Sequence, residues 1–136
     1  MGSKNKLKRF KENEGFPNVI QPTREEVLNN FKFKGNWNSL FKNNNPISLE
    51  LGCGKGEYTI ALARKNPNIN YIGIDLKGAR FWRGAKTALE ENLTNVAFIR
   101  TLIGLIDLLF NENEVAEIWI TFPDPQIKYT RTKHRL

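Results

Sequence analysis

The strongest constraint on the fold is a regular alternation of short apolar segments with amphipathic segments, from residue 46 to residue 122. The apolar segments are predicted as strands at residues 47–51, 71–75, 96–100 and 115–122. Between them, helical spacing of apolar residues predicts helices at residues 56–65, 77–92 and 103–110. Because the apolar runs in the strands are continuous, both faces of the sheet should be covered. The sequence therefore predicts an α/β fold with an open, doubly wound sheet of about four parallel strands.

The residues that precede this alternation have a different character. Residues 1–22 are polar, with breaks at Gly15, Pro17 and Pro22, so a basic and largely extended N-terminal arm is predicted there. Thr23 is a predicted N-cap of a short helix that runs to about Phe33, and the Asn-rich residues 34–45 are a predicted loop. The expected organisation is thus an arm at residues 1–22 and one α/β domain at residues 23–136.

Charge and cysteine content restrict the class of protein. The net charge is +7, with basic clusters at the start and end of the chain and a nearly neutral centre. This distribution favours a polyanionic partner such as nucleic acid, with two solvated basic ends as the alternative. The single cysteine, Cys53, has no partner for an internal disulfide, and the sequence contains no apolar run long enough for a membrane span. A cytoplasmic protein without membrane or metal partners is expected.

A glycine-rich turn follows the first predicted strand and opens a helix. Gly52, Gly54 and Gly56 form a G-x-G-x-G pattern directly after Glu50 and Leu51. Glycines allow the backbone to turn sharply and to approach a ligand closely. Dinucleotide sites prefer G-x-G-x-x-G, whereas the shorter spacing after an acidic residue is typical of S-adenosylmethionine-dependent methyltransferases. A tight turn without a ligand is the structural alternative.

Further candidate residues follow or precede the other strands. Asp75 ends the second strand, where a carboxylate can accept hydrogen bonds from the ribose of a cofactor or can cap the following helix. Asn95, directly before the third strand, is either a cofactor contact or a turn residue. After the fourth strand, Asp124 stands between Pro123 and Pro125, which should hold its carboxylate rigidly at the switch point of the sheet.

These motifs together resemble the tRNA (guanine-N7)-methyltransferase family. The segment 121–125, Thr-Phe-Pro-Asp-Pro, followed by Lys128 and the basic run at 133–136, resembles the most specific signature of that family. The segments 49–56, 72–75 and 95–96 stand where its other motifs stand, and residues 4–7 and 16–19 resemble its N-terminal region. The resemblance thus covers nearly the whole chain.

The resemblance implies a Rossmann-like domain that methylates N7 of the guanine at position 46 in the tRNA variable loop. The resemblance also implies that S-adenosylmethionine is the methyl donor and that Asp124 is the catalytic carboxylate. The resemblance and the position of each motif assign the cofactor to Glu50, Gly52, Gly54, Gly56, Asp75, Asn95, Leu102 and Asp124. They assign tRNA contacts to Lys128, Arg131, Lys133 and Arg135.

The sequence departs from the family pattern at two places. Gln126 and Ile127 stand where the family has Trp-Pro, which affects local stacking but not the carboxylate. Leu102 stands within a segment where the family has Gly-Asp-Ala, so adenine must be held there by backbone groups or apolar contact. Family members also continue well beyond this length, so we expect a chain that lacks the C-terminal part and is nearly inactive alone.

Other functions are compatible with parts of the pattern. A nicotinamide-dependent oxidoreductase shares the strand–glycine–Asp layout but fits the glycine spacing less well. A methyltransferase of small molecules or proteins explains the cofactor motifs without the basic termini, and a non-catalytic RNA-binding module explains only the charge. The sequence does not distinguish a monomer from a homodimer.

Overall fold

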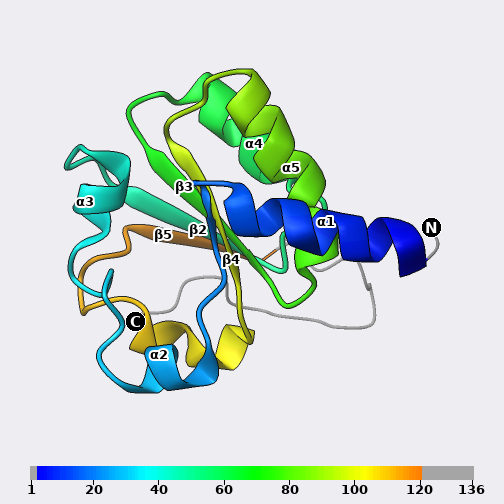
Figure 1. Ribbon diagram of the computed structural model, residues 1–136. Coiled ribbons are helices and arrows are strands. Elements are labelled where there is room, and N and C mark those ends of the chain that lie inside the picture. Colours follow the sequence, from blue (N-terminus) through cyan, green and yellow to red (C-terminus); the bar gives the residue numbers. More distant parts are fainter. Residues whose placement is uncertain (1–2, 121–136) are drawn as a thin grey trace.

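The computed structural model describes residues 3–120, which form one parallel sheet with helices on both faces (Figure 1). The strand order is β1-β4-β3-β2-β5. The strands are β1 (Val19–Ile20), β2 (Ile47–Leu51), β3 (Asn70–Asp75), β4 (Val96–Arg100) and β5 (Glu117–Ile120). The helices are α1 (Ser3–Gly15), α2 (Arg24–Leu28), α3 (Trp37–Phe41), α4 (Glu57–Lys65), α5 (Gly78–Glu90) and the 3-10 helix η1 (Ile103–Leu108). The predicted doubly wound α/β fold is confirmed.

The two faces of the sheet are covered by separate apolar clusters. Helices α4 and α5 pack on one face, and α1 packs against α5 and crosses it at an angle (Figure 1). The short helices α2, α3 and η1 contribute to the cluster on the other face. All five residues of β2 are buried, as expected of a strand covered on both sides.

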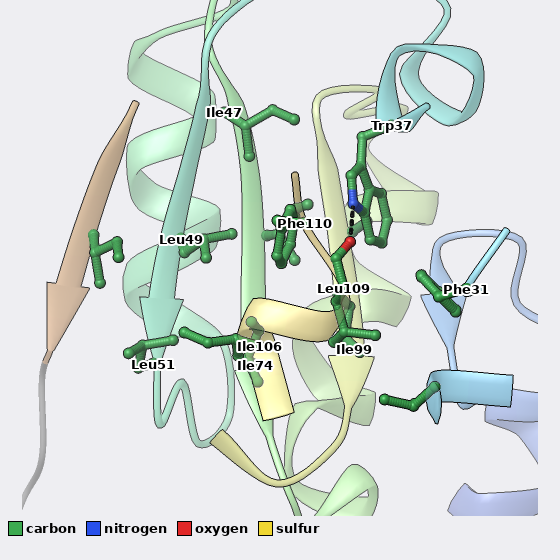
Figure 2. Packing of buried hydrophobic residues seen from close by; sticks show 14 of the residues in the cluster. Phe31, Trp37, Ile47, Leu49, Leu51, Ile74, Ile99, Ile106, Leu109 and Phe110 are labelled. Atoms are coloured by element: carbon green, nitrogen blue, oxygen red, sulfur yellow. Dashed lines mark hydrogen bonds between the residues drawn. The ribbon is translucent and has the colours of Figure 1, made fainter. Parts of the chain in front are cut away.

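Trp37 is the centre of the second cluster. It is fully buried, and its ring stacks with Phe33 and Phe110 at centroid distances of 5.2 Å and 5.1 Å. Its indole Nε1 donates a 2.9 Å hydrogen bond to the carbonyl oxygen of Leu109, as Figure 2 shows. The ring therefore joins the segment around α3 to the segment that follows η1.

The four predicted strands are all present, and the fourth lies beside the first. Strand β5 pairs with β2, with Leu49 opposite Ile118. The predicted N-cap is also confirmed, since Thr23 Oγ1 accepts from Glu26 N and Glu26 Oε1 accepts from Thr23 N. The carboxylate of Glu26 carries a lowered pKa because of these hydrogen bonds.

The structure differs from the prediction of an extended arm at residues 1–22. Residues Ser3–Gly15 form helix α1, and Val19–Ile20 form a fifth strand that pairs with β4. The helix is stabilised by tertiary contacts with α5 rather than by an apolar stripe of its own. Asn13 Nδ2 donates to Gly78 O at 3.0 Å, and Trp82 Nε1 donates to Glu12 Oε1 at 2.7 Å. A polar composition therefore did not indicate the helix.

Two further segments differ in detail. The helix expected to reach Phe33 ends at Leu28, and Asn30 adopts a left-handed φ of 64° that a continuing helix excludes. Helix α3 forms inside the predicted loop at residues 34–45, because Trp37 and Phe41 are buried on the core. The predicted third helix is a 3-10 helix. Between residues 3 and 120, no helix combines the length and apolar character that a membrane crossing needs.

Replacement of Trp37 by Ala should lower the free energy of unfolding by about 3–5 kcal/mol, because it leaves a cavity and an unpaired Leu109 carbonyl. Urea denaturation followed by circular dichroism measures the change. Leu7→Ala is the control, since Leu7 is 67% exposed and its truncation should change the free energy of unfolding by less than about 0.5 kcal/mol. Equal effects of the two substitutions would contradict the central position of Trp37.

Candidate functional site

The carboxyl ends of β2, β3 and β4 bring three loops to one edge of the sheet. Leu51 is opposite Ile74, and Asp75 is opposite Arg100. The order of strands reverses at β2, which has β3 on one side and β5 on the other. In open α/β sheets, ligands bind outside the carboxyl ends of the strands at such a switch point. The candidate site therefore consists of the turns that follow these strands.

The glycine loop after β2 has a backbone that requires glycine. Gly52, Gly54 and Gly56 have φ angles of 74°, 57° and 80°. These left-handed values are strained for residues with a Cβ atom. The carbonyl oxygen of Ile74 accepts hydrogen bonds from Gly52 N (2.8 Å) and Cys53 N (3.0 Å), which join the loop to β3. The loop thus has a fixed shape, with its last glycine as the N-cap of α4.

Asp75 links the glycine loop to the start of α5. Its Oδ2 accepts from Gly54 N at 2.9 Å, and its Oδ1 accepts from Lys77 N at 2.9 Å. The residue is only half-buried, and each carboxylate oxygen has a second acceptor position. Asp75 therefore organises the site and can still accept hydrogen bonds from a ligand. The sequence predicted a ligand contact or a helix cap for Asp75, but no sequence pattern indicated the hydrogen bond to the glycine loop.

Glu50 lies one residue before the end of β2 and is buried at 5% exposure. Its Oε1 accepts a hydrogen bond from Thr59 Oγ1, on helix α4. Glu50 therefore connects β2 to α4, the two elements that the glycine loop joins. A direct contact of Glu50 with a cofactor stays a prediction.

The ring of Phe98 occupies a space that three glycines leave open. A Cβ atom at Gly56 would lie 2.7 Å from the ring, and one at Gly73 or Gly84 would lie 2.8 Å from it. A Cβ atom at Gly84 would also lie 2.9 Å from the carbonyl oxygen of Lys55, within the glycine loop. Helix α5 can approach the loop closely because residue 84 has no side chain. The importance of Gly73 and Gly84 was not recognised from the sequence.

Cys53, between the first two glycines of the loop, is buried at 7% exposure. Burial, with smaller contributions from the charges of Asp75 and Glu50, raises the pKa of its thiol well above the ordinary value. The thiol is therefore protonated at neutral pH. Cys53 is therefore a small packing residue rather than a reactive group.

Two apolar side chains flank the site. Leu102 follows β4 and is 49% exposed, and Leu76 follows Asp75 and is also 49% exposed. Leu102 was predicted from the sequence as a site residue, whereas Leu76 was not. Large apolar residues exposed at the ends of adjacent strands give this edge of the sheet an apolar surface beside the Asp75 carboxylate.

Asn95 is not brought together with the other predicted cofactor residues. It directly precedes β4, so it lies at the amino edge of the sheet, opposite the glycine loop. Its Nδ2 donates to the carbonyl oxygens of Ala63 (3.1 Å), Asn66 (3.1 Å) and Ile69 (2.9 Å). Asn95 therefore holds the connection between α4 and β3, a structural role that differs from the turn residue before β4 that the sequence suggested as the alternative.

The remaining predicted residues lie outside the described part of the chain. These are Asp124, Lys128, Arg131, Lys133 and Arg135. Within residues 3–120, no three His, Cys, Asp or Glu side chains are grouped in a way that would hold a metal ion.

Comparison with known proteins relates the chain to methyltransferases. Residues 44–136 match the sequence model of a family described as "Putative methyltransferase". The chain is 75% identical to a tRNA (guanine-N(7)-)-methyltransferase of Christiangramia forsetii, over 100% of this chain and 62% of that protein. It is 54% identical to the protein of the same name from Porphyromonas gingivalis, over 85% of this chain and 49% of that protein. The chain thus spans at most 62% of the length of these curated relatives.

Solved structures support the fold. A 30S ribosomal A1408 methyltransferase from an uncultured bacterium superposes with a TM-score of 0.57 at 20% identity, over 68% of this chain and 45% of that one. An antibiotic-related methyltransferase superposes with a TM-score of 0.54 at 23% identity, over 68% and 47% of the two chains. At this identity, the similarity establishes a Rossmann-like methyltransferase fold.

Replacement of Gly84 by Ala should destabilise the protein, although Ala normally stabilises a helix interior by about 0.5–1 kcal/mol relative to Gly. The added methyl group would overlap the Phe98 ring and the Lys55 carbonyl, so we expect a loss of about 1–3 kcal/mol in the free energy of unfolding. Thermal and urea denaturation measure the loss. Gly104→Ala in η1 is the matched control, because a Cβ atom there has no neighbour within 4 Å. A Gly84→Ala variant as stable as Gly104→Ala would show that the close approach of α5 is not required.

Proposed function

The chain belongs to the methyltransferase family whose sequence model it matches, and from this premise we propose that its full-length protein methylates tRNA at N7 of a guanine. The methyl donor in this proposal is S-adenosylmethionine, and the target is the guanine at position 46 in the variable loop. Because the chain spans only part of its relatives, the activity, substrate and partners are proposals for the whole protein. The names and high identity of the curated relatives support this choice of substrate.

One structural observation supports the cofactor most directly. The Asp75 carboxylate is bonded to the glycine loop at the switch point of a Rossmann-like sheet. An ordinary tight turn does not need a half-buried carboxylate from the neighbouring strand together with three left-handed glycines. This arrangement suits a ligand that combines an amino-acid portion, a ribose and a base. Between Gly52 and Gly56 the loop contains one basic residue, Lys55, that could contact a phosphate.

The residues present fit S-adenosylmethionine. The space next to Gly54 is open, since a Cβ atom there would meet nothing within 4 Å. The glycine loop would wrap the amino-acid and ribose portions, Asp75 would accept hydrogen bonds from the ribose hydroxyls, and Leu102 would contact the adenine. Leu76 would contribute a second apolar contact. When bound, this cofactor supplies an activated methyl group on a sulfonium centre.

The protein's own contribution to the reaction is mainly positioning. Guanine N7 has a lone pair and no proton, so no general base is required. Orientation of the two reactants in a near-attack geometry can contribute roughly 7–11 kcal/mol. In this proposal Asp124 accepts hydrogen bonds from N1–H and the amino group of the guanine, which orients the ring and stabilises its developing positive charge. Lys128, Arg131, Lys133 and Arg135 would contact tRNA phosphates.

The partner and location follow from the substrate. The protein would act on tRNA in the cytoplasm, as a monomer or as a homodimer. The positive charge of the chain supports association with a polyanion of this kind.

Replacement of Asp75 by Asn should weaken binding of S-adenosylhomocysteine about 10–100-fold, measured by isothermal titration calorimetry. An Asn side chain has one acceptor oxygen, so the N–H of Gly54 or of Lys77 would lose its partner, and the charge that favours ribose hydroxyls would be lost. Asp107→Asn is the matched control, since Asp107 is an exposed carboxylate on η1. If Asp75→Asn bound the ligand as well as Asp107→Asn, the role of Asp75 would be excluded.

The function itself is tested with the full-length protein, methyl-labelled S-adenosylmethionine and two tRNA transcripts. We expect label to enter a transcript with guanine at position 46 and not a transcript with adenine there. Asp124→Asn should reduce turnover strongly, because its amide would present a donor where the guanine already presents one. Binding of the cofactor product without methylation of any tRNA would instead indicate a methyltransferase with another substrate.

A further inference from the structure

Three cationic side chains surround one indole ring on the surface formed by α1 and α5. The Cζ atom of Arg9 lies 4.5 Å from the ring centroid of Trp82, the Cζ atom of Arg83 lies 5.3 Å from it, and Lys86 Nζ lies 5.1 Å from it. Trp82 itself is only 9% exposed. The indole is thus a buried platform around which the charged groups are fixed. We refer to Arg9, Arg83 and Lys86 as the cation cluster.

The cluster depends on the docking of α1 against α5. Arg9 comes from α1, whereas Arg83 and Lys86 come from α5. The indole Nε1 of Trp82 donates to Glu12, and Asn13 donates to the carbonyl oxygen of Gly78 at the start of α5. These bonds hold α1 against α5, which it crosses in Figure 1. Like charges on two helices are therefore held close together in spite of their repulsion.

The surrounding surface is also positive. Between residues 5 and 15, α1 carries four cationic residues and two carboxylates, and α5 carries three cationic residues and one carboxylate. That carboxylate, Glu90, lies 3.5 Å from Arg83 in an exposed ion pair, which is weak in water. Lys6, Lys8 and Lys11 on α1 are exposed. An excess of fixed positive charge on one face favours a polyanionic partner.

The cluster is also close to the candidate cofactor site. Helix α5 begins at Gly78, just after the turn that Asp75 organises. With a rise of about 1.5 Å per residue, Arg83 and Lys86 lie roughly 7 Å and 12 Å along the helix from its first residue. A chain of phosphates that crosses the cluster would therefore pass near the glycine loop.

We propose that the cation cluster, together with the exposed lysines of α1, binds the phosphate backbone of the RNA substrate. Guanidinium and ammonium groups contact phosphates in a way that does not depend on sequence, so this surface would position the RNA rather than select the base. A lipid surface is a poorer match, because the large apolar side chain that α1 exposes is Leu7, without an apolar stripe around it. The inference rests on the proposed function, since it assumes an RNA substrate.

The test compares two triple variants of the full-length protein. Arg9→Gln/Arg83→Gln/Lys86→Gln removes the cation cluster, and Lys32→Gln/Lys34→Gln/Lys42→Gln removes the same charge from the exposed segment near α2 and α3. Fluorescence anisotropy gives the Kd for a labelled tRNA transcript between 50 and 300 mM salt. Calorimetry with S-adenosylhomocysteine and thermal denaturation report whether the fold and the glycine loop are intact.

The proposal predicts a loss confined to the first variant. Its tRNA affinity should fall about tenfold or more near 0.1 M salt, and the slope of log affinity against log salt should decrease by about 2–3. The second variant should change affinity less than about threefold. Equal losses of tRNA affinity in both variants, or no loss in the first variant, would overturn the role proposed for the cation cluster. Binding of tRNA by the unchanged protein would still stand in that case. Failure of the unchanged protein to bind any tRNA would overturn both this inference and the proposed function.

A measurement on the unchanged protein covers the case in which the first variant unfolds. Acylation of lysines, read by peptide mass spectrometry, should be slowed by bound tRNA at Lys86 and the lysines of α1, but not at Lys32 or Lys34. Equal reactivity of Lys86 with and without tRNA would overturn the proposal. Protection of Lys86 by phosphatidylserine vesicles but not by tRNA would also overturn it, in favour of a membrane partner.

Discussion

The position of the Phe98 ring is the constraint on which the candidate site depends. The ring lies on β4, stacks with Phe81 of α5 at 5.3 Å, and fills the space beside Gly56, Gly73 and Gly84. One aromatic side chain thus contacts the sheet, the loop and the helix that together form the site. Because packed interiors tolerate little overlap, the shape of the glycine loop is set by this contact as well as by the freedom of its own glycines.

Asp75 adds hydrogen bonds to the packing contacts that fix the glycine loop. Its two oxygens join the glycine loop to the first turn of α5, so the loop and the helix share one carboxylate. A ligand that bonds to Asp75 therefore acts on a group already fixed in place, which reduces the entropy lost on binding. The same turn determines where α5 begins and hence where Arg83 and Lys86 lie relative to the loop. In the proposed enzyme, the short segment from Asp75 to Gly78 would therefore fix the positions of both the cofactor site and the RNA surface.

The sequence predicted strands β2, β3, β4 and β5 because the pattern of apolar residues that indicates a buried strand is local. The continuous apolar runs of β2, β3 and β4 and the glycines that follow β2 have few alternative interpretations. Helix α1 was missed because its stability comes from Asn13 and Glu12, whose partners on α5 are 65 and 70 residues away in the chain. Asn95 was assigned to the site from its place in a motif, although the strand direction puts it at the opposite edge. The space that Gly73 and Gly84 leave for Phe98 involves three separate segments, and no local pattern reports it.

Leu102 changes how the proposed cofactor would be recognised. An acidic side chain at this place would accept a hydrogen bond from the adenine amino group, with a net contribution of about 1.5–3 kcal/mol and a strong preference for that base. Leu102 and Leu76, each 49% exposed, can bury apolar surface against the ring at about 25 cal/mol per Å², but this contribution hardly distinguishes one purine from another. Selectivity would then depend on the polar portion of the ligand, for which the proposal assigns Asp75 to the ribose and the glycine loop to the amino-acid portion. In the proposed enzyme, recognition would then be concentrated at the carboxylate that also accepts the hydrogen bonds of Gly54 and Lys77, so the shape of the site and its affinity for the cofactor would depend on the same side chain.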